Sequence, residues 1–445
     1  MAKKIAKKVP KKKPASANRL SLGAILADES RYLIRTYKRP PIVFTHGKGV
    51  RLYDSQGRAY LDFLGGLAVN ALGHAHPRMV RVIRREAGRA THVSNLFHNP
   101  YQGPLARKLA EWSGLDRVFF ANSGTEAIEG ALKLARAYSH GKSAPDGAPK
   151  TRILALENSF HGRTMGALSV THTPKYREPF TPLIPSVEFV RFNDVADLEA
   201  KFGDSVCAIV IEPIQGEGGI YEVSEAFWKR ASELAVQHNA ALIADEIQSG
   251  LGRTGRKFAY QKFASFPDIV TVAKPLAGGL PLGSFIASER FASAFSPGFH
   301  GSTFGGGPLV CATALEFLTI VEEENLFENI RARGAELRAG LNKLAGRFDF
   351  IREIRGEGFI VGVDLSVEGA PFIEESLSRG LVINCTHEHI LRLLPPYIAR
   401  AKDVAEFLEK FEAVLTHGIK SAKAWPAAPL AVAEAHTEPL AAAAR

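Results

Sequence analysis

The chain has 445 residues, of which 46% are hydrophobic and 23% charged, with 40 glycines, 25 prolines and three cysteines. This length favours two or three domains, and the composition excludes collagen, a disulfide-stapled secreted module and a fully disordered chain. No run of about 18 uncharged apolar residues occurs, so we expect no membrane contact. Cys207, Cys311 and Cys385 lie far apart without metal-ligand spacing, which favours a reducing, cytoplasmic location.

Most of the net charge of +10 lies at the N-terminus. Residues 1–19 carry seven lysines, one arginine and no acid, which leaves only +2 for the rest of the chain. The segment lacks the Arg- and Ser-rich composition of a transit peptide and the apolar run of a secretory signal. We interpret residues 1–19 as a disordered basic tail, and a polyanion-binding protein that acts through this tail is the alternative of a different class.

The first structured elements that the sequence predicts are antiparallel strands within residues 42–63. Apolar and polar residues alternate there around two turn signals, Gly47-Lys48-Gly49 and Ser55-Gln56-Gly57. This pattern is typical of a β-ribbon. We assign residues 20–70 to the N-terminal part of a smaller α+β domain.

Residues 71–318 predict a large α/β domain with a mostly parallel central sheet. A strand candidate at 117–121 precedes a helical stretch at 125–138 whose apolar residues share one face. Four more runs are almost continuously apolar, which is typical of strands covered by helices on both faces. These runs span residues 152–157, 206–212, 241–246 and 268–273.

The C-terminal part of the chain mixes helical patterns with strands such as residues 358–365. We expect residues 319–422 to complete the smaller domain, which would then be built from both ends of the chain. Residues 423–445 are rich in Ala and Pro and predict a loosely ordered tail.

Polar residues follow three of the buried runs. Asn122-Ser123-Gly124-Thr125 opens a helix, where free N–H groups and the helix dipole suit a phosphate, although Ser and Thr are also ordinary N-caps. A carboxylate at Asp245 suits a cation such as a protonated pyridine nitrogen, and desolvation would make Lys274 a nucleophilic amine. Ligands of open α/β sheets bind at the carboxyl ends of strands, so these groups predict one site; the alternative for each is a solvent-exposed residue at the start of a loop.

Six longer motifs occur in a fixed order along the chain. They are FANSGTEAIEGALKLAR (120–136), FHGRTMGALS (160–169), IEPIQGEGG (211–219), ADEIQSGLGRTG (244–255), AKPLAGGLPLG (273–283) and HGSTFGG (300–306). With them, residues 22–418 resemble the class III, pyridoxal-phosphate-dependent aminotransferases of fold type I. The resemblance implies pyridoxal 5′-phosphate as cofactor and small amino and oxo acids as substrates.

By this resemblance, Lys274 would form a Schiff base with the cofactor and then move protons. Asp245 would pair with the pyridinium nitrogen, which keeps the ring an electron sink. Gln248 would hydrogen-bond the phenolic oxygen of the ring. Proline at 275, where the family has a small residue, predicts an extended backbone at Lys274.

The resemblance also assigns the remaining contacts to the cofactor. Gly124 and Thr125 would hold the phosphate, and Phe160 would stack on the ring, with a simple core aromatic as its alternative. Thr303 would reach the phosphate of a neighbouring subunit, which implies a homodimer with active sites at the interface. Ser302 would contact the substrate.

Two arginines match substrate-binding residues of the family. Arg163 would clamp a carboxylate in a bidentate manner. Arg392 would pair with Glu217, which neutralises it for a ligand with one uncharged end and releases it for a dicarboxylate such as 2-oxoglutarate. Either arginine could instead form a surface salt bridge, which contributes little energy.

The sequence leaves more than one amino donor open. Gly65-Gly66-Leu67 stands where ornithine enzymes carry an aromatic residue, and this smaller surface leaves room for an acylated α-amine. We therefore expect N2-acetylornithine as donor and 2-oxoglutarate as acceptor, in a ping-pong reaction of arginine biosynthesis. The alternatives are succinylornithine or succinyldiaminopimelate, ornithine, 4-aminobutyrate and carrier-bound lysine. His74 and His76 belong to a turn typical of the family, so we expect no metal site.

Overall fold

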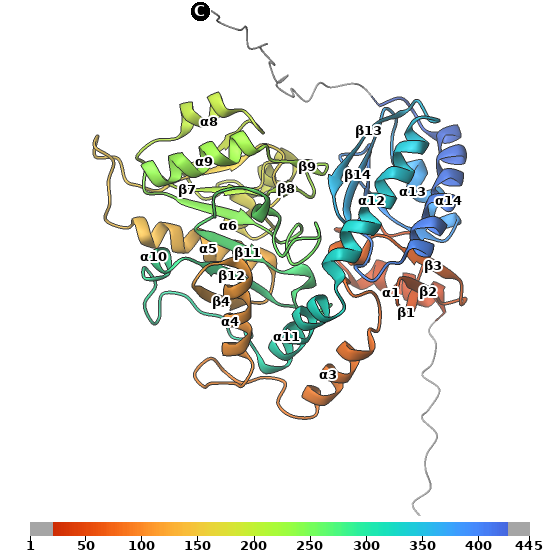
Figure 1. The fold of residues 1–445 in the computed structure, drawn as a ribbon, viewed down its shortest axis with the longest axis horizontal. Helices are drawn as coiled ribbons and strands as arrows, with labels where there is room; N and C mark the ends of the chain where they lie inside the picture. The colour runs from red at the N-terminus through yellow and green to blue at the C-terminus, as the bar shows by residue number, and fades with distance from the viewer. Residues whose placement is uncertain (1–20, 426–445) are drawn as a thin grey trace, which may run out of the picture.

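A seven-stranded sheet lies at the centre of the larger of two parts of the molecule (Figure 1). Its order is β4-β12-β11-β10-β7-β5-β6, and β12 alone runs against its neighbours. The strands are β4 (Arg117–Ala121), β5 (Arg152–Leu156), β6 (Val187–Val190), β7 (Val206–Ile211), β10 (Ala241–Asp245), β11 (Ile269–Val272) and β12 (Gly283–Ala287). The predicted α/β fold class with a mostly parallel sheet is thus confirmed.

The structure, a computed structural model, describes residues 21–425. The predicted basic tail and the stretch 426–445 of the predicted Ala- and Pro-rich tail lie outside the described residues. Each of the five predicted strands of the large domain is found, whereas β6 and β12 were not predicted. The sequence of β12 begins with Gly283-Ser284, which interrupts an apolar run. Strand β6 is only partly buried, so its sequence is not continuously apolar either.

Hydrophobic side chains cover both faces of this sheet. Ile243 of β10 packs in one cluster with Ile128 of α5 (Gly124–Ser139). Its neighbour Leu242 packs in another cluster with Trp228 of α9 (Glu225–Gln237). Because successive side chains of a strand point to opposite faces, such a strand needs apolar residues at every position.

Two four-stranded sheets form the smaller part of the molecule (Figure 1). The first has the order β1-β2-β3-β15, with β15 (Leu381–Val382) parallel to β3 (Ala59–Asp62). This pairing joins segments from the two ends of the chain in one sheet. The other strands of this sheet are β1 (Phe44–Lys48) and β2 (Arg51–Asp54).

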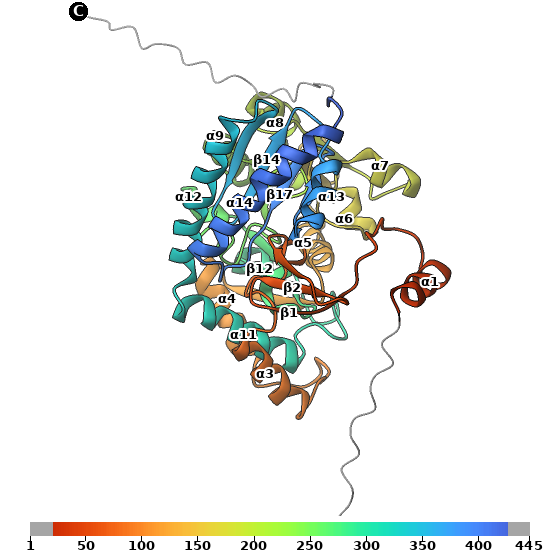
Figure 2. The same ribbon diagram turned by 90° about the vertical axis from the view of Figure 1, so that its right-hand side faces the viewer.

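The second sheet is antiparallel throughout, in the order β13-β14-β17-β16. Its strands are β13 (Ile351–Glu357), β14 (Ile360–Leu365), β16 (Asn384–Thr386) and β17 (Ile390–Leu393). Figure 2 shows the helices that cover it, which are α12 (Leu326–Ala345), α13 (Ala370–Ser378) and α14 (Ala401–Gly418). The domain boundaries at 70/71 and 318/319 stay predictions; α11 (Pro308–Glu323) runs through the second of them.

The remaining elements connect or flank these sheets. They are α1 (Leu22–Tyr32), α2 (Gly65–Ala68), α3 (Pro77–Ala87), α4 (Gln102–Ser113), α6 (Met165–Ser169), α7 (Pro174–Arg177), α8 (Val195–Lys201), α10 (Glu289–Ala292) and the two-residue strands β8 (Ile214–Gln215) and β9 (Tyr221–Glu222). Among residues 21–425, no helix is long and apolar enough to cross a membrane.

The first residues of the predicted C-terminal tail contact the smaller part of the molecule. Ala424 forms a β-bridge with Val367, and the backbone N–H of Trp425 donates to Ser366 at 2.8 Å. The indole of Trp425 stacks on His389 with ring centroids 5.2 Å apart. Backbone pairing and aromatic stacking therefore hold the chain up to residue 425.

A stacked aromatic pair joins the N-terminal segment to the last helix. Phe63, at the end of β3, and Phe407 of α14 are fully buried, and their ring centroids lie 4.4 Å apart. We expect Phe63→Ala to lower the free energy of unfolding by about 3–5 kcal/mol, because it leaves a cavity in this contact. The measurement is urea unfolding, with Phe180→Ala at a site 54% exposed as the control. Equal losses in both variants would contradict the prediction.

Candidate active site

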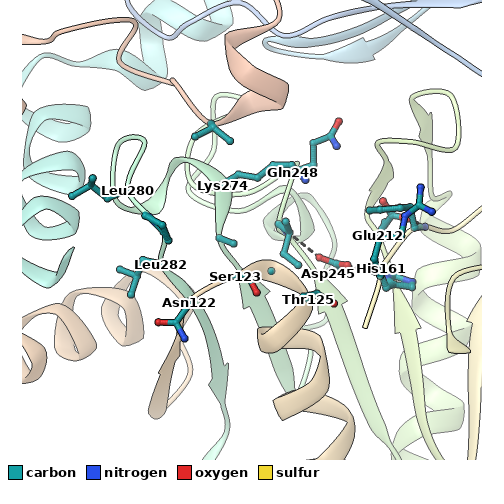
Figure 3. Close-up of a pocket in the computed structure, with 18 of the residues that line it drawn as sticks. Asn122, Ser123, Thr125, His161, Glu212, Asp245, Gln248, Lys274, Leu280 and Leu282 are labelled. Carbon is teal, nitrogen blue, oxygen red and sulfur yellow. Dashed lines mark hydrogen bonds and ion pairs between the residues drawn. The ribbon is translucent and has the colours of Figure 1, made fainter. Parts of the chain in front are cut away.

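A cavity of about 420 Å³ lies at the carboxyl ends of the parallel strands of the large sheet (Figure 3). Its size is within the roughly 300–1,000 Å³ of small-molecule sites. Seven residues predicted from the sequence line it: Gly124, Thr125, Phe160, Arg163, Asp245, Gln248 and Lys274. Strands that run in one direction bring their ends to one edge, so loops far apart in sequence converge there.

Asp245 ends β10 and is 4% exposed. Its Oδ1 accepts hydrogen bonds from the N–H of Ile247 and the hydroxyl of Thr271, both at 3.1 Å. Its Oδ2 lies 2.6 Å from Nδ1 of His161. These donors replace water around the buried carboxylate and fix its direction.

His161 was not predicted as a functional residue, although it stands in the FHGR motif beside Phe160. Burial lowers the pKa of His161, but the hydrogen bond to Asp245 and the charge of Asp245 outweigh burial and hold the pKa above its usual range. The contact therefore stabilises the charged form of the ring relative to that of an isolated histidine. Nε2 of His161 is buried with no hydrogen-bond partner among the described residues.

Lys274 follows β11 and lines the same cavity (Figure 3). Burial lowers the pKa of its amine, although the charges of Glu217 and Asp245 oppose this effect. The expectation of an extended backbone at Lys274 was wrong: its φ is +34°, and it begins a short helical turn, Lys274–Leu276. The chain must leave the strand sharply here, and the N–H of Leu276 closes the turn on the carbonyl of Ala273 at 2.9 Å.

The N-terminus of α5 opens on the cavity directly after β4. The hydroxyl of Ser123 caps this 16-residue helix by accepting from the N–H of Glu126 at 3.3 Å. A Cβ at Gly124 would come within 2.9 Å of Ile247, so glycine allows the two loops to approach. The helix dipole and the N–H groups of the first turn, which have no partner within the helix, suit an anion such as phosphate.

Phe160 and Arg163 lie on the loop that follows β5. The N–H of Phe160 donates to Oε2 of Glu212 at 3.0 Å, which holds the loop against the end of β7. The guanidinium of Arg163 lies 3.6 Å from the centroid of the Tyr176 ring and 5.5 Å from that of Phe160. This stacking orients an exposed guanidinium at the cavity and leaves its edge available to a carboxylate.

Arg392 is fully buried on β17, so it is not a surface ion pair. Its NH1 donates to Oε1 of Glu217 at 2.6 Å and to Oε1 of Gln248 at 3.1 Å. Burial raises the pKa of Glu217, but the charge and hydrogen bond of Arg392 outweigh this effect and lower the pKa. Gln248 lines the cavity, so it connects the predicted Arg392–Glu217 pair to the site.

Ser302 and Thr303 do not line this cavity. The hydroxyl of Ser302 accepts hydrogen bonds from the Asn122 side chain at 3.2 Å and from the N–H of Gly305 at 2.9 Å. It lies in a separate hollow beside Gln102. The roles assigned to these two residues, like the other residue roles, stay predictions.

The two histidines of the GHAHP turn have acidic partners. Nε2 of His74 lies 2.8 Å from Asp62, and Nε2 of His76 lies 3.6 Å from Glu324. Within residues 21–425, no group of three or more His, Cys, Asp or Glu side chains could hold a metal ion.

The donor set of the cavity fits pyridoxal 5′-phosphate. A buried carboxylate with a fixed direction suits a pyridinium nitrogen, and a desolvated amine suits the carbonyl carbon of the cofactor. A helix N-terminus for the phosphate and an aromatic side chain for the ring line the same space. Asp245, Lys274, Gly124, Thr125 and Phe160 supply these groups.

The chain is similar to known proteins over most of its length. The model of the family "Aminotransferase class-III" matches residues 32–415. The acetylornithine aminotransferase of Methanocaldococcus jannaschii is 42% identical over 388 residues, which are 87% of this chain and 97% of the relative. The acetylornithine aminotransferase of Aquifex aeolicus is 41% identical over 86% of this chain and 100% of its own length.

Solved structures show the same similarity. The ornithine aminotransferase of Toxoplasma gondii has a TM-score of 0.85 at 33% identity and covers 90% of this chain and 96% of its own. The acetylornithine aminotransferase of Elizabethkingia anophelis has a TM-score of 0.78 at 31% identity, with 89% of this chain and 99% of its own covered.

Two buried glutamates of the site region were also missed by sequence reasoning. Glu212 accepts from Phe160 and Gly216, and Glu246 accepts from the hydroxyl of Ser249 at 2.6 Å and from the N–H of Tyr260 at 2.7 Å. Burial raises the pKa of each to about 7. Both stand in the quoted motifs, but their burial depends on neighbours that are distant in sequence.

Glu246 makes stability depend on pH in a testable direction. Its pKa rises from 4.5 to about 7 on folding, so the folded protein binds the extra proton between these values. The associated stability is complete below pH 4.5 and is lost as the pH rises through about 7. We expect Glu246→Gln to flatten the fall of the urea midpoint between about pH 5 and pH 8. Glu374→Gln, at an exposed site on α13, should keep the wild-type slope; identical slopes in all three proteins would contradict the prediction.

Proposed function

The chain belongs to the class III aminotransferases, and from this membership we propose that it transfers the terminal amino group of N2-acetylornithine to 2-oxoglutarate. The products are N-acetylglutamate semialdehyde and glutamate, as in arginine biosynthesis. One observation carries the proposal: a single cavity joins the Lys274 amine, the buried Asp245 and the Arg163 guanidinium. The relatives from Methanocaldococcus jannaschii and Aquifex aeolicus, both acetylornithine aminotransferases, support the donor.

Pyridoxal 5′-phosphate is the cofactor. When bound, it supplies an electron sink for the substrate carbon that carries the amino group. Asp245 would hold the pyridine nitrogen in its charged form, and His161 keeps the carboxylate in place through the 2.6 Å contact. Gly124 and Thr125 would bind the phosphate, and Phe160 would cover the ring.

Lys274 would act as the general acid and base. Burial lowers the pKa of its amine, which therefore accepts and returns a proton more readily near neutral pH than an exposed lysine would. The turn at Lys274–Leu276 places the amine in the cavity. There it would take up the proton from the substrate carbon that carries the amino group and later return it.

Arg163 would bind the carboxylate that both amino substrates share. Glu217 covers Arg392 through the 2.6 Å contact, which suits a donor that has no second carboxylate. For 2-oxoglutarate, Glu217 would leave and Arg392 would bind the second carboxylate. One site could then serve both half-reactions.

We also propose a homodimer in a cytoplasmic setting. Several large apolar side chains near the Ser302–Thr303 loop are exposed, including Leu96 at 85%, Phe97 at 69% and Phe304 at 65%. Such a cluster favours a protein interface, and Thr303 would reach the phosphate site of the partner from there. Cys207, Cys311 and Cys385 are free thiols, which suits a reducing compartment.

Ornithine is the second candidate donor because the ornithine aminotransferase of Toxoplasma gondii shares the fold closely. The loop at Gly65-Gly66-Leu67 bears on this choice. Gly66 and Leu67 have φ near +60°, and the loop continues to Val69, which lines the cavity. The small side chains of this turn support an acylated donor over ornithine.

Absorption spectroscopy tests the cofactor and the donor together. The purified protein loaded with pyridoxal 5′-phosphate should show a visible band that N2-acetylornithine bleaches and 2-oxoglutarate restores. Parallel additions are ornithine, 4-aminobutyrate and succinylornithine. A band bleached by ornithine or 4-aminobutyrate but not by N2-acetylornithine would overturn the donor, and a missing band would overturn the mechanism.

Two substitutions test the proposed roles. Lys274→Ala should lower kcat by about 10²–10⁴-fold or more, because it removes the proton-transferring group.

Arg163→Ala should raise the KM of both amino substrates about tenfold or more, because a charge-assisted contact is lost. Arg290→Ala removes an arginine that also stacks on aromatic rings, Tyr138 and Phe291, but lies outside the cavity lining. An effect of Arg290→Ala equal to that of Arg163→Ala would refute the carboxylate role.

A further inference from the structure

Strand β16 contacts both members of the Arg392–Glu217 pair, at two adjacent positions of one face. Asn384 is the register partner of Arg392 in the antiparallel β16–β17 pair, and its Oδ1 accepts from Nε of Arg392 at 3.2 Å. Two residues further along, the hydroxyl of Thr386 donates to the backbone carbonyl of Glu217 at 2.5 Å. Side chains two residues apart on a strand share a face, so β16 holds the two residues separately.

The hydrogen bonds of Arg392 do not depend on Glu217 alone. NH1 has two N–H groups but three acceptors within reach, since the carbonyl of Gly216 lies 3.0 Å away in addition to Glu217 and Gln248. Departure of Glu217 therefore leaves two acceptors for two N–H groups. The guanidinium keeps its place without its charged partner.

The other end of the guanidinium has hydrogen-bonding capacity that the described residues do not use. NH2 of Arg392 is buried and has no hydrogen-bond partner among the described residues. Asn384 holds Nε, so NH2 is the group of the guanidinium that the described residues leave free to donate. A carboxylate that reaches NH2 would accept a charge-assisted hydrogen bond from it.

The contact from Thr386 acts on the backbone of Glu217 and leaves its side chain free. The loop is also tightly packed there, since a Cβ at Gly216 would come within 2.4 Å of the Gln248 amide. With its backbone held, Glu217 can move away from Arg392 only by rotating its side chain, which is partly exposed. A movement of the whole loop is not required.

We propose that β16 is a positioning strand for substrate exchange, in which Asn384 orients Arg392 for the dicarboxylate and Thr386 holds Glu217 over Arg392 for the donor, which has a single carboxylate. The inference rests on the proposed function, because it takes 2-oxoglutarate as acceptor. Neither Asn384 nor Thr386 lines the cavity. Their effect on a ligand therefore passes through Arg392 and Glu217. The two residues should therefore affect the two substrates in different ways.

The test uses the holoenzyme and two unreactive probes of equal length, glutarate with two carboxylates and pentanoate with one. Titration calorimetry gives their dissociation constants, and steady-state kinetics gives the KM of each substrate. Asn384→Ala should weaken glutarate binding about tenfold or more and leave the KM of N2-acetylornithine nearly unchanged, because one hydrogen bond to a charged group is lost. Asn384→Leu, which keeps a side chain of similar size, should give the same result as Asn384→Ala. It replaces Asn384→Ala in the test if that variant does not fold.

Thr386→Val should have the opposite pattern. It should raise the KM of N2-acetylornithine about three- to tenfold, through the loss of one hydrogen bond, and leave glutarate binding unchanged or tighter. The control is Cys385→Ala on the other face of β16, where the thiol packs against Gly369. This variant should leave both substrates unaffected.

Three results would overturn the inference. If Asn384→Ala and Asn384→Leu keep the full preference for glutarate over pentanoate, Asn384 does not orient Arg392 for the dicarboxylate. Equal shifts of both substrates in the β16 variants and in Cys385→Ala would indicate strand packing alone. A wild-type protein that binds glutarate no better than pentanoate would overturn the proposed acceptor as well, which separates that failure from the first two.

Discussion

A buried charge is unfavourable unless other charges or hydrogen bonds replace the water around it, and the site depends on this constraint. Asp245 meets it through Ile247, Thr271 and His161, so its direction is set before any ligand binds. Arg392, fully buried, meets it through acceptors from three separate segments of the chain. Preorganised charges of this kind bind and orient a ligand without further rearrangement.

The large sheet brings these charges together. Its parallel strands are apolar at nearly every position because helices cover both faces, so a charge within a strand would have no partner there. In β10 and β11 the charged positions come where the strands end, at Asp245, the last residue of β10, and at Lys274 beyond β11. Parallel neighbours end at one edge, and the chemistry therefore gathers in the cavity that they share.

The smaller part of the molecule supplies the arginine that we propose distinguishes the ligands. Arg392 projects from its antiparallel sheet and reaches Gln248, which belongs to the loop after β10 of the large sheet. One hydrogen bond at 3.1 Å thus links the guanidinium to a residue that lines the cavity. The strand beside Arg392 supplies Asn384 and Thr386, so the proposed choice between substrates would depend on a sheet that carries none of the groups proposed to react.

Local patterns in the sequence determined the α/β fold, the five main strands and the residues at their ends, since burial on both faces leaves a continuous apolar run and the groups proposed to react stand where that run ends. The motifs around Lys274, Asp245 and Arg163 also determined the family. Other features depend on contacts between residues far apart in the chain, which no single segment encodes. His161 reaches Asp245 only because β5 and β10 end at the same edge of the sheet, with β7 between them, and the raised pKa of Glu246 depends on its burial in the folded chain. The tertiary structure alone decided the left-handed turn at Lys274 and the pairing of Asn384 with Arg392, because packing outweighs the local preference of a residue before proline and cross-strand register is a property of the folded sheet.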